Sequence, residues 1–144
     1  MVTQDPPDPD AVRALRRKVR ADIASGAGLV LRPGRGDHAV ATSKTFRSLA
    51  RVCGAAPSAD GAFVRRALPA DVLAEKLPEL VTMTDAKRRQ LAGVSANRSH
   101  QLLAGAIVAD AVMDIFGVPE LEICPWALRE GIILERLDAL RVAG

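Results

Sequence analysis

Hydroxyl side chains and one lysine stand at a strand-to-helix junction in residues 39–46, which read AVATSKTF. The pattern predicts a strand over residues 38–41, a turn at Thr42 and Ser43, and a helix from about Lys44. The start of a helix exposes backbone N–H groups and a partial positive charge, so Thr42 to Thr45 could bind a phosphate or a carboxylate. In the simpler interpretation Ser43 only caps the helix, which contributes about 1 kcal/mol. The residues alone leave both interpretations open.

Two other candidate motifs, a Walker A loop and the pair Arg98 and His100, provide no catalytic site. Lys44 and Thr45 are placed as at the end of a Walker A loop, but the glycines of that motif are absent, which excludes it. Arg98, with His100 just after it, precedes an apolar helix, where it could meet an anion or lie in an exposed first turn. No partner residue can be named for His100 as a general base. The sequence therefore predicts no catalytic residue.

A charged pair interrupts an apolar face near the C-terminus, in the stretch CPWALREG at residues 124–131. Arg129 and Glu130 flank that face at the first turn of a predicted helix. Gly131 costs about 1 kcal/mol in a helix interior, so we expect a neighbouring group close to the backbone there. The alternative is a Glu near the positive end of the helix and a solvated Arg. The apolar face itself consists of Trp126, Ile133, Leu137 and Leu140.

Hydrophobic periodicity and turn residues predict alternating helices and strands. Residues 97–116 are apolar nearly all round, which indicates a central buried helix, and Gly105 lies in a small-residue patch that would let another backbone approach. The first helix is expected to stop at Gly26, before a glycine-rich loop. In the second helix Phe46, Leu49 and Ala50 form the apolar side, with Arg47 and Arg51 on the other. Predicted helices cover residues 10–25, 44–52, 70–80, 85–91, 97–116 and 126–140, and predicted strands cover 38–41 and 121–124.

This order predicts an α/β layer with parallel strands. Two or three short strands make a small sheet for a free-standing domain, so the chain reads as part of a larger fold. We divide it into a disordered lead-in (1–9), a helix and loop (10–36) and a main unit (37–144).

Composition limits the function classes. The net charge of +3 comes mainly from arginine, which suits phosphate oxygens, but it is too small to prove a polyanionic partner. The basic face of the first helix is either solvated or guides a polyanion. Aromatic residues make up only 3%, which argues against base stacking on nucleic acid. The two cysteines and two histidines show no zinc spacing, and no long uncharged apolar run or secretory signal is present. We therefore expect a cytoplasmic protein with no membrane or nucleic-acid partner.

Three motifs in order resemble the C-terminal part of the exopolyphosphatase and guanosine pentaphosphate phosphohydrolase family (Ppx/GppA), particularly its actinobacterial branch. They are VATSKTFRSLAR (residues 40–51), NRSHQLLAGAIVADAVM (97–113) and ICPWALREGIILERLD (123–138). The resemblance implies part of the second lobe of an actin-like, ribonuclease-H-like fold. It also implies hydrolysis of terminal phosphoanhydrides in polyphosphate or guanosine pentaphosphate, with Mg²⁺ in the complete enzyme.

The resemblance also assigns roles to residues. Thr42, Ser43, Lys44 and Thr45 match a turn near the cleft between the two lobes, and Arg98 matches a phosphate-facing arginine. Arg129 and Glu130 match the LREG pair, which with Gly131 and Gly105 would shape an interface. Many family members have Gly in place of Lys44 and Ala-Asp in place of Ser99 and His100, so the resemblance does not carry nucleotide binding over to these points.

The N-terminal lobe of that family has no counterpart here. The resemblance places the general-base glutamate, the metal-binding carboxylates and the DxGGGS phosphate loop outside this sequence, so we expect this chain alone to be inactive and to bind no metal. Its expected partners are the phosphate substrate, the missing lobe and a second copy in a homodimer. The alternatives are a non-catalytic module that binds polyphosphate or guanosine tetra- or pentaphosphate, and an actin-like nucleotide-binding or kinase lobe.

Overall fold

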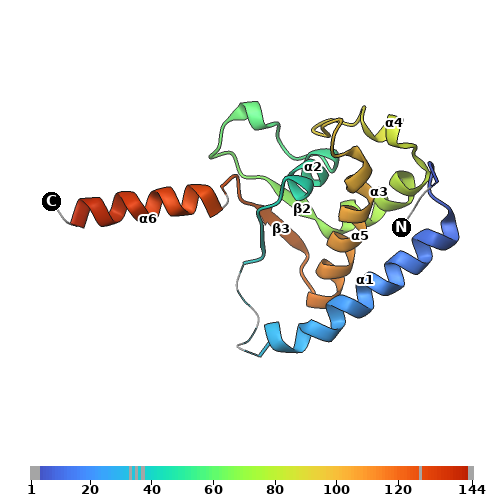
Figure 1. The fold of residues 1–144 in the computed structure, drawn as a ribbon, viewed down its shortest axis with the longest axis horizontal. Helices are drawn as coiled ribbons and strands as arrows, with labels where there is room; N and C mark the ends of the chain where they lie inside the picture. Colours follow the sequence, from blue (N-terminus) through green and yellow to red (C-terminus); the bar gives the residue numbers. More distant parts are fainter. Residues whose placement is uncertain (1–3, 33, 35, 37, 127, 143–144) are drawn as a thin grey trace.

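The computed structural model describes residues 4–142 except 33, 35, 37 and 127. Helices dominate it, and a small sheet lies at one end of the helical part (Figure 1). The elements are α1 (Pro9–Val30), β1 (Val40–Ala41), α2 (Lys44–Val52), the 3-10 turn η1 (Ser58–Asp60), β2 (Ala67–Pro69), α3 (Ala70–Thr82), α4 (Asp85–Arg88), α5 (Ser99–Phe116), β3 (Glu120–Ile123) and α6 (Leu128–Val142).

The sheet has the strand order β1-β3-β2. β1 pairs with β3 in parallel, Val40 opposite Glu122, as the alternation of strands and helices predicts. β2 pairs with β3 in antiparallel fashion, Ala67 opposite Glu122, and the sequence did not predict this strand. The sheet is therefore mixed: the two predicted strands are parallel, as predicted, and the additional strand β2 is antiparallel. Pro69 stands at the end of β2, at the edge of the sheet, where a missing N–H costs no ladder hydrogen bond.

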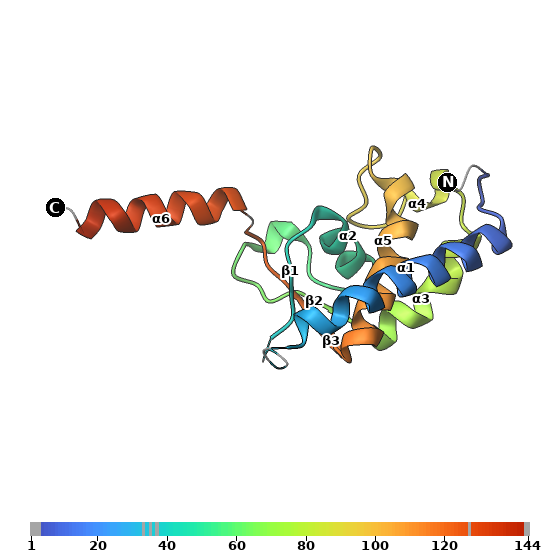
Figure 2. The same ribbon diagram turned by 60° about the horizontal axis from the view of Figure 1, so that its bottom comes forward.

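α5 is the centre of the fold, as its apolar sequence predicts. It contacts α1, α2, α3 and α4, and both ribbon views show α1 running along one side of it (Figures 1 and 2). Leu102, Ala106, Ile107 and Ala109 of α5 are all at most 1% exposed. By length and hydropathy α5 could cross a membrane, but nearly half of it is buried among its neighbours, as in the core helix of a globular fold.

α1 runs further than predicted. It begins at the Asp8 cap and the favourable Pro9, but it continues through Gly26 and Gly28 to Val30. The predicted end at Gly26 is wrong because Ala27, between the two glycines, is buried, and burial outweighs a cost of about 1 kcal/mol for each glycine.

Two arginines of α1 form ion pairs with α5 rather than meeting only solvent. Arg16 lies 2.9 Å from the Asp110 carboxylate and Arg20 lies 2.5 Å from that of Asp114. The basic face of α1 is therefore partly neutralised, which weakens its interpretation as a polyanion guide.

The segment before α1 contacts the main body in the part that the structure describes. The Asp5 carboxylate accepts hydrogen bonds from the backbone N–H of Asp85 at 2.7 and 2.9 Å, and Pro7 is buried. Arg88 of α4 is 5% exposed and lies 3.4 Å from the same carboxylate. Asp5 therefore ties this segment to α4.

α6 extends away from the other elements in both ribbon views (Figures 1 and 2). Its large apolar side chains are about half exposed: Ile132, Ile133, Leu134, Leu137 and Leu140. The predicted helix over residues 126–140 is confirmed, with both ends shifted by two residues. The described part of the chain leaves its apolar side chains about half exposed.

Candidate anion-binding groove

A groove of about 580 Å³ lies between α2, the segment around residues 55–58 and the residues that precede α5. We call it the basic groove. Its lining residues are Lys44, Arg47, Ser48, Arg51, Ala55, Ala56, Pro57, Ser58, Arg66, Gly93, Ser95, Asn97 and Arg98.

Positive charge distinguishes the basic groove. Lysine or arginine supplies five of its lining residues, and none of the lining residues carries a carboxylate. Within the part of the chain that the structure describes, no carboxylate oxygen lies within 4 Å of any of these five cations. The charge is therefore available to an anionic ligand.

α2 positions three of these cations because of its amphipathic pattern. Lys44, Arg47, Ser48 and Arg51 are spaced i, i+3, i+4 and i+7, which places them on one face of the helix. Leu49 and Ala50 are buried against the core. α2 therefore presents one face to the core and another to the groove.

Ser43 is the N-cap of α2, and its Oγ accepts a hydrogen bond from the backbone N–H of Phe46 at 3.1 Å. Ser43 therefore caps the helix, a contact that both interpretations of this turn allow. Ser43 and Thr42 are exposed beside the groove without lining it, and Thr45 turns toward α5. Of the five predicted phosphate-binding residues, the structure brings Lys44 and Arg98 together in one groove.

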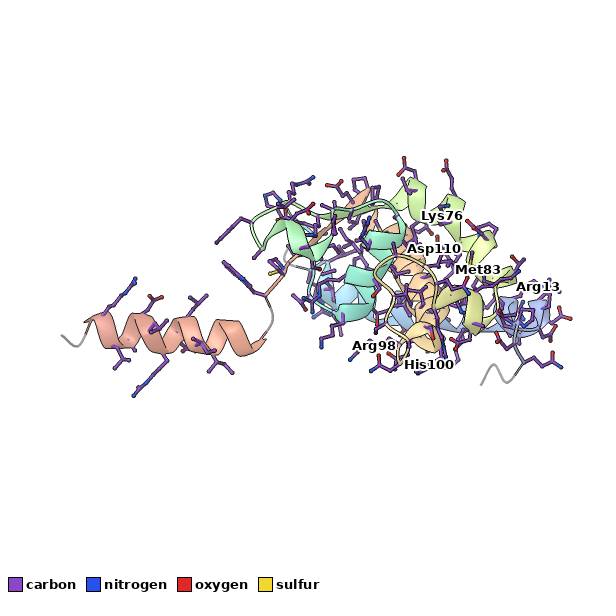
Figure 3. The ribbon with its side chains drawn as sticks, turned by 90° about the horizontal axis from the view of Figure 1, so that it is seen from above. Arg13, Lys76, Met83, Arg98, His100 and Asp110 are labelled. Atoms are coloured by element: carbon purple, nitrogen blue, oxygen red, sulfur yellow. The ribbon has the colours of Figure 1, made fainter. Side chains whose placement is uncertain are left out.

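Arg98 precedes α5 and joins the groove from the opposite wall. Its backbone N–H donates to the carbonyl of Ser95 at 2.9 Å, and its carbonyl accepts from Gln101 at the same distance. Figure 3 shows Arg98 and His100 at the same end of α5, with Asp110 further along the helix. His100 lines a different pocket, beside Asp5 and Arg88, so it does not belong to the basic groove.

Arg66 belongs to the groove although no sequence motif pointed to it. Its guanidinium donates to three backbone carbonyls, those of Ala56 at 2.9 Å, Pro57 at 2.6 Å and Val64 at 2.9 Å. These bonds hold the segment that forms one wall. Because carbonyl acceptors carry no net charge, the positive charge of Arg66 stays in the groove.

Gly105 brings α2 close to α5, as the small-residue patch predicts. A Cβ at Gly105 would lie 2.3 Å from Thr45 Cγ2 and 3.8 Å from Leu49 Cδ1. The first turn of α2 therefore rests on the surface that Gly105 leaves open.

We expect Gly105→Ala to destabilise the fold by about 1–3 kcal/mol, because overpacking at Thr45 outweighs the higher helix propensity of alanine. Urea unfolding followed by circular dichroism measures this loss. The Gly105→Ala, Thr45→Ser double variant removes the clashing methyl group and should recover most of it. Equal losses in the single and double variants would contradict the contact.

The predicted interface residues near the C-terminus are Arg129, Glu130 and Gly131. The side chains of Arg129 and Glu130 lie outside the described part of the structure. Apart from its chain neighbours and the backbone of its own helix, no heavy atom that the structure describes lies within 4 Å of the position that a Cβ would take at Gly131, so the expected close neighbour is not found among the described residues. Their role at an interface stays a prediction.

Neither the groove nor the other described residues offer a metal centre. Among them no three His, Cys, Asp or Glu side chains come together in a way that could hold a metal ion. Mg²⁺ prefers carboxylate oxygens, so the cationic lining of the groove does not suit it. The Cys53 thiol is half-buried, and burial raises its pKa above the usual value, which favours the neutral form rather than a metal-binding thiolate.

Comparison with known proteins identifies the family. The model of the Ppx/GppA phosphatase family matches residues 1–140. The chain belongs to this family. Exopolyphosphatase 1 of Mycobacterium tuberculosis and that of Mycobacterium bovis are each 50% identical to it over 135 residues. The corresponding protein of Mycobacterium leprae is 46% identical over the same length.

These relatives are longer proteins. The aligned region covers 94% of this chain but only 39% of the M. tuberculosis protein. It corresponds to the C-terminal part of the relatives, as the three motifs predict. The chain therefore spans about two fifths of the Ppx/GppA proteins that it matches.

Solved structures show the same fold. An exopolyphosphatase from Cytophaga hutchinsonii superposes with a TM-score of 0.79 at 16% identity, covering 96% of this chain and 45% of that one. The Ppx/GppA family member from Aquifex aeolicus gives a TM-score of 0.75 at 18% identity, with 94% and 43% covered. The predicted α/β class and the assignment to part of a larger Ppx/GppA fold are confirmed, and the actin-like lobe is consistent with these neighbours.

Proposed function

We propose that this chain forms the anion-binding wall of an exopolyphosphatase-type hydrolase. That enzyme releases terminal phosphate from polyphosphate or guanosine pentaphosphate. The observation that carries the proposal is the basic groove, where five cations meet without a carboxylate in the lining. Membership of the Ppx/GppA phosphatase family supports phosphoanhydride hydrolysis as the reaction.

The groove residues can perform two tasks in such a reaction. Arginine guanidinium groups such as that of Arg98 can hold phosphate oxygens in pairs, and the Lys44 ammonium adds a point charge. They would fix the chain of phosphates while water attacks the terminal phosphorus in line. They would also stabilise the negative charge that develops in the transition state.

The remaining groups of the reaction lie outside these 144 residues in this proposal. They are the general base that activates water, the metal-binding carboxylates and the other wall of the cleft. Mg²⁺, when bound there, would neutralise charge on the phosphates. The exposed apolar side chains of α6 fit a chain that meets another lobe or a second copy. A cytoplasmic location, without a membrane or nucleic-acid partner, is part of the same proposal.

A non-catalytic module that binds polyphosphate or guanosine pentaphosphate is the second candidate. The groove favours it as much as the first, because binding alone needs no base or metal.

Two assays on the purified chain separate these functions. Calorimetric titration with polyphosphate should show binding that weakens as salt rises, because a polyanion releases its counterions on binding. A phosphate-release assay with Mg²⁺ should show no turnover by the chain alone. Release should appear when the N-terminal remainder of a mycobacterial Exopolyphosphatase 1 is added. Binding without release in either case would favour the module, and no binding would overturn both functions.

A further inference from the structure

One row of side chains on α2 faces the groove. Lys44 lies at one end of this row and Arg51 lies at the other end. At a rise of 1.5 Å per residue, the two positions lie about 10 Å apart along the helix axis. The cations of the basic groove therefore form a track along α2, not a single point where one phosphate would satisfy all of them.

The Arg51 side chain is held in place by its neighbours. Its Nη1 donates to the carbonyl of Ala55 at 3.0 Å, which fixes the guanidinium beside the loop wall of the groove. A neutral carbonyl leaves the charge of Arg51 uncompensated, and the other nitrogens of the fork can still donate.

Because Gly93 has no side chain, it leaves room for the aliphatic part of the Arg51 side chain. Gly93 has a φ of +79°, and a Cβ there would lie 2.5 Å from Arg51 Cγ and 2.7 Å from Arg51 Cβ. The Ser48 hydroxyl donates to the carbonyl of Gly93 at 2.8 Å, which ties the loop to the same face of α2. Any side chain at Gly93 would push the Arg51 stem aside and strain the backbone.

We propose that Arg51 is a distal phosphate-binding residue of the basic groove and that Gly93 is its positioning residue. This inference rests on the proposed function and deepens it. Lys44 binds a phosphate at one end of the groove-facing row of α2, Arg51 binds a phosphate further along the same chain, and Arg98 contacts the chain from the segment that precedes α5. A linear polyanion longer than the span between Lys44 and Arg51 engages all of these residues, whereas pyrophosphate is too short to do so.

The test is a comparison of chain lengths. Affinities for pyrophosphate, tripolyphosphate and a long polyphosphate are measured by calorimetry for the full chain and its variants. Arg51→Ala should weaken binding of the long polyphosphate about tenfold, the loss of one charge-assisted contact, and leave pyrophosphate within about twofold. Arg51→Met keeps most of the stem that covers Gly93 and should show the same selective loss, which separates charge from packing. Lys87→Ala, at an exposed site on α4, removes one charge outside the groove and should change neither affinity.

Gly93→Ala tests the positioning role. It should reproduce the selective loss for the long polyphosphate, and the Gly93→Ala, Arg51→Ala double variant should lose no more than Arg51→Ala alone. Equal losses for pyrophosphate and long polyphosphate in Arg51→Met would overturn the distal assignment. No loss in either Arg51 variant, while Lys44→Ala and Arg98→Ala weaken binding, would overturn it and leave the proposed function standing. If the unmodified chain bound none of the three ligands, both would fail.

Discussion

Replacing Lys44 and Arg98 together by alanine is expected to weaken polyphosphate binding by at least about a hundredfold, with little change in stability. The two side chains come from different walls of the basic groove, and each can make charge-assisted hydrogen bonds to phosphate, worth about 1.5–3 kcal/mol apiece. Removing both therefore takes one cation away from each wall of the groove. Both residues reach solvent, so the free energy of unfolding should change by about 0.5 kcal/mol or less.

The salt dependence of binding provides a second readout of the same variant. The slope of the logarithm of the binding constant against the logarithm of salt should fall by about one for each cation removed. Lys87→Ala is the matched control for a change of charge outside the groove. An unchanged affinity in the double variant, with an intact fold, would show that polyphosphate does not use this groove.

The sequence predicted the elements whose local pattern is strong. α5 is apolar nearly all round, and that composition can be satisfied only at the centre of a fold, where the structure places it. α2 was predicted from Ser43 as a cap and from the spacing of Leu49 and Ala50. These features act within a few residues of each other, so the sequence displays them directly.

The predictions that were wrong depend on contacts between distant residues. β2 has only three residues and ends in proline, and it exists because β3 offers an edge to pair with. α1 passes Gly26 because Ala27 is buried in the folded chain, and the local sequence does not display that burial. Tertiary packing outweighed local propensity in both cases.

The groove was only partly predictable for the same reason. Lys44 and Arg98 were singled out separately, and their meeting follows from how α2 packs on α5. The i, i+3 and i+7 spacing of Lys44, Arg47 and Arg51 was visible, but without the opposite wall it reads as an ordinary solvated face. Arg66 lies in the groove because three carbonyls of an irregular segment hold it, and that arrangement has no sequence pattern.

Leu49→Ala should have the converse effect to the groove variant: a large loss of stability with the affinity of the folded protein kept. Leu49 is 0% exposed and belongs to the main hydrophobic core. Its side chain extends from α2 toward Gly105 of α5. Truncating a buried leucine removes apolar contacts and leaves a cavity, so the free energy of unfolding should fall by about 2–5 kcal/mol. Urea unfolding followed by circular dichroism gives that loss.

The Leu49→Ala variant tests whether the core-facing and groove-facing sides of α2 act independently. Ser48 and Arg51 line the groove, whereas Leu49 between them in sequence points into the core. If the faces act independently, polyphosphate affinity measured well below the unfolding midpoint should stay within about threefold of the unmodified chain, since separate sites usually add. Leu49→Val, a smaller truncation, serves where Leu49→Ala leaves too little folded protein. A loss of affinity as large as that of the Lys44 and Arg98 double variant would mean that the groove depends on core packing rather than on its own cations.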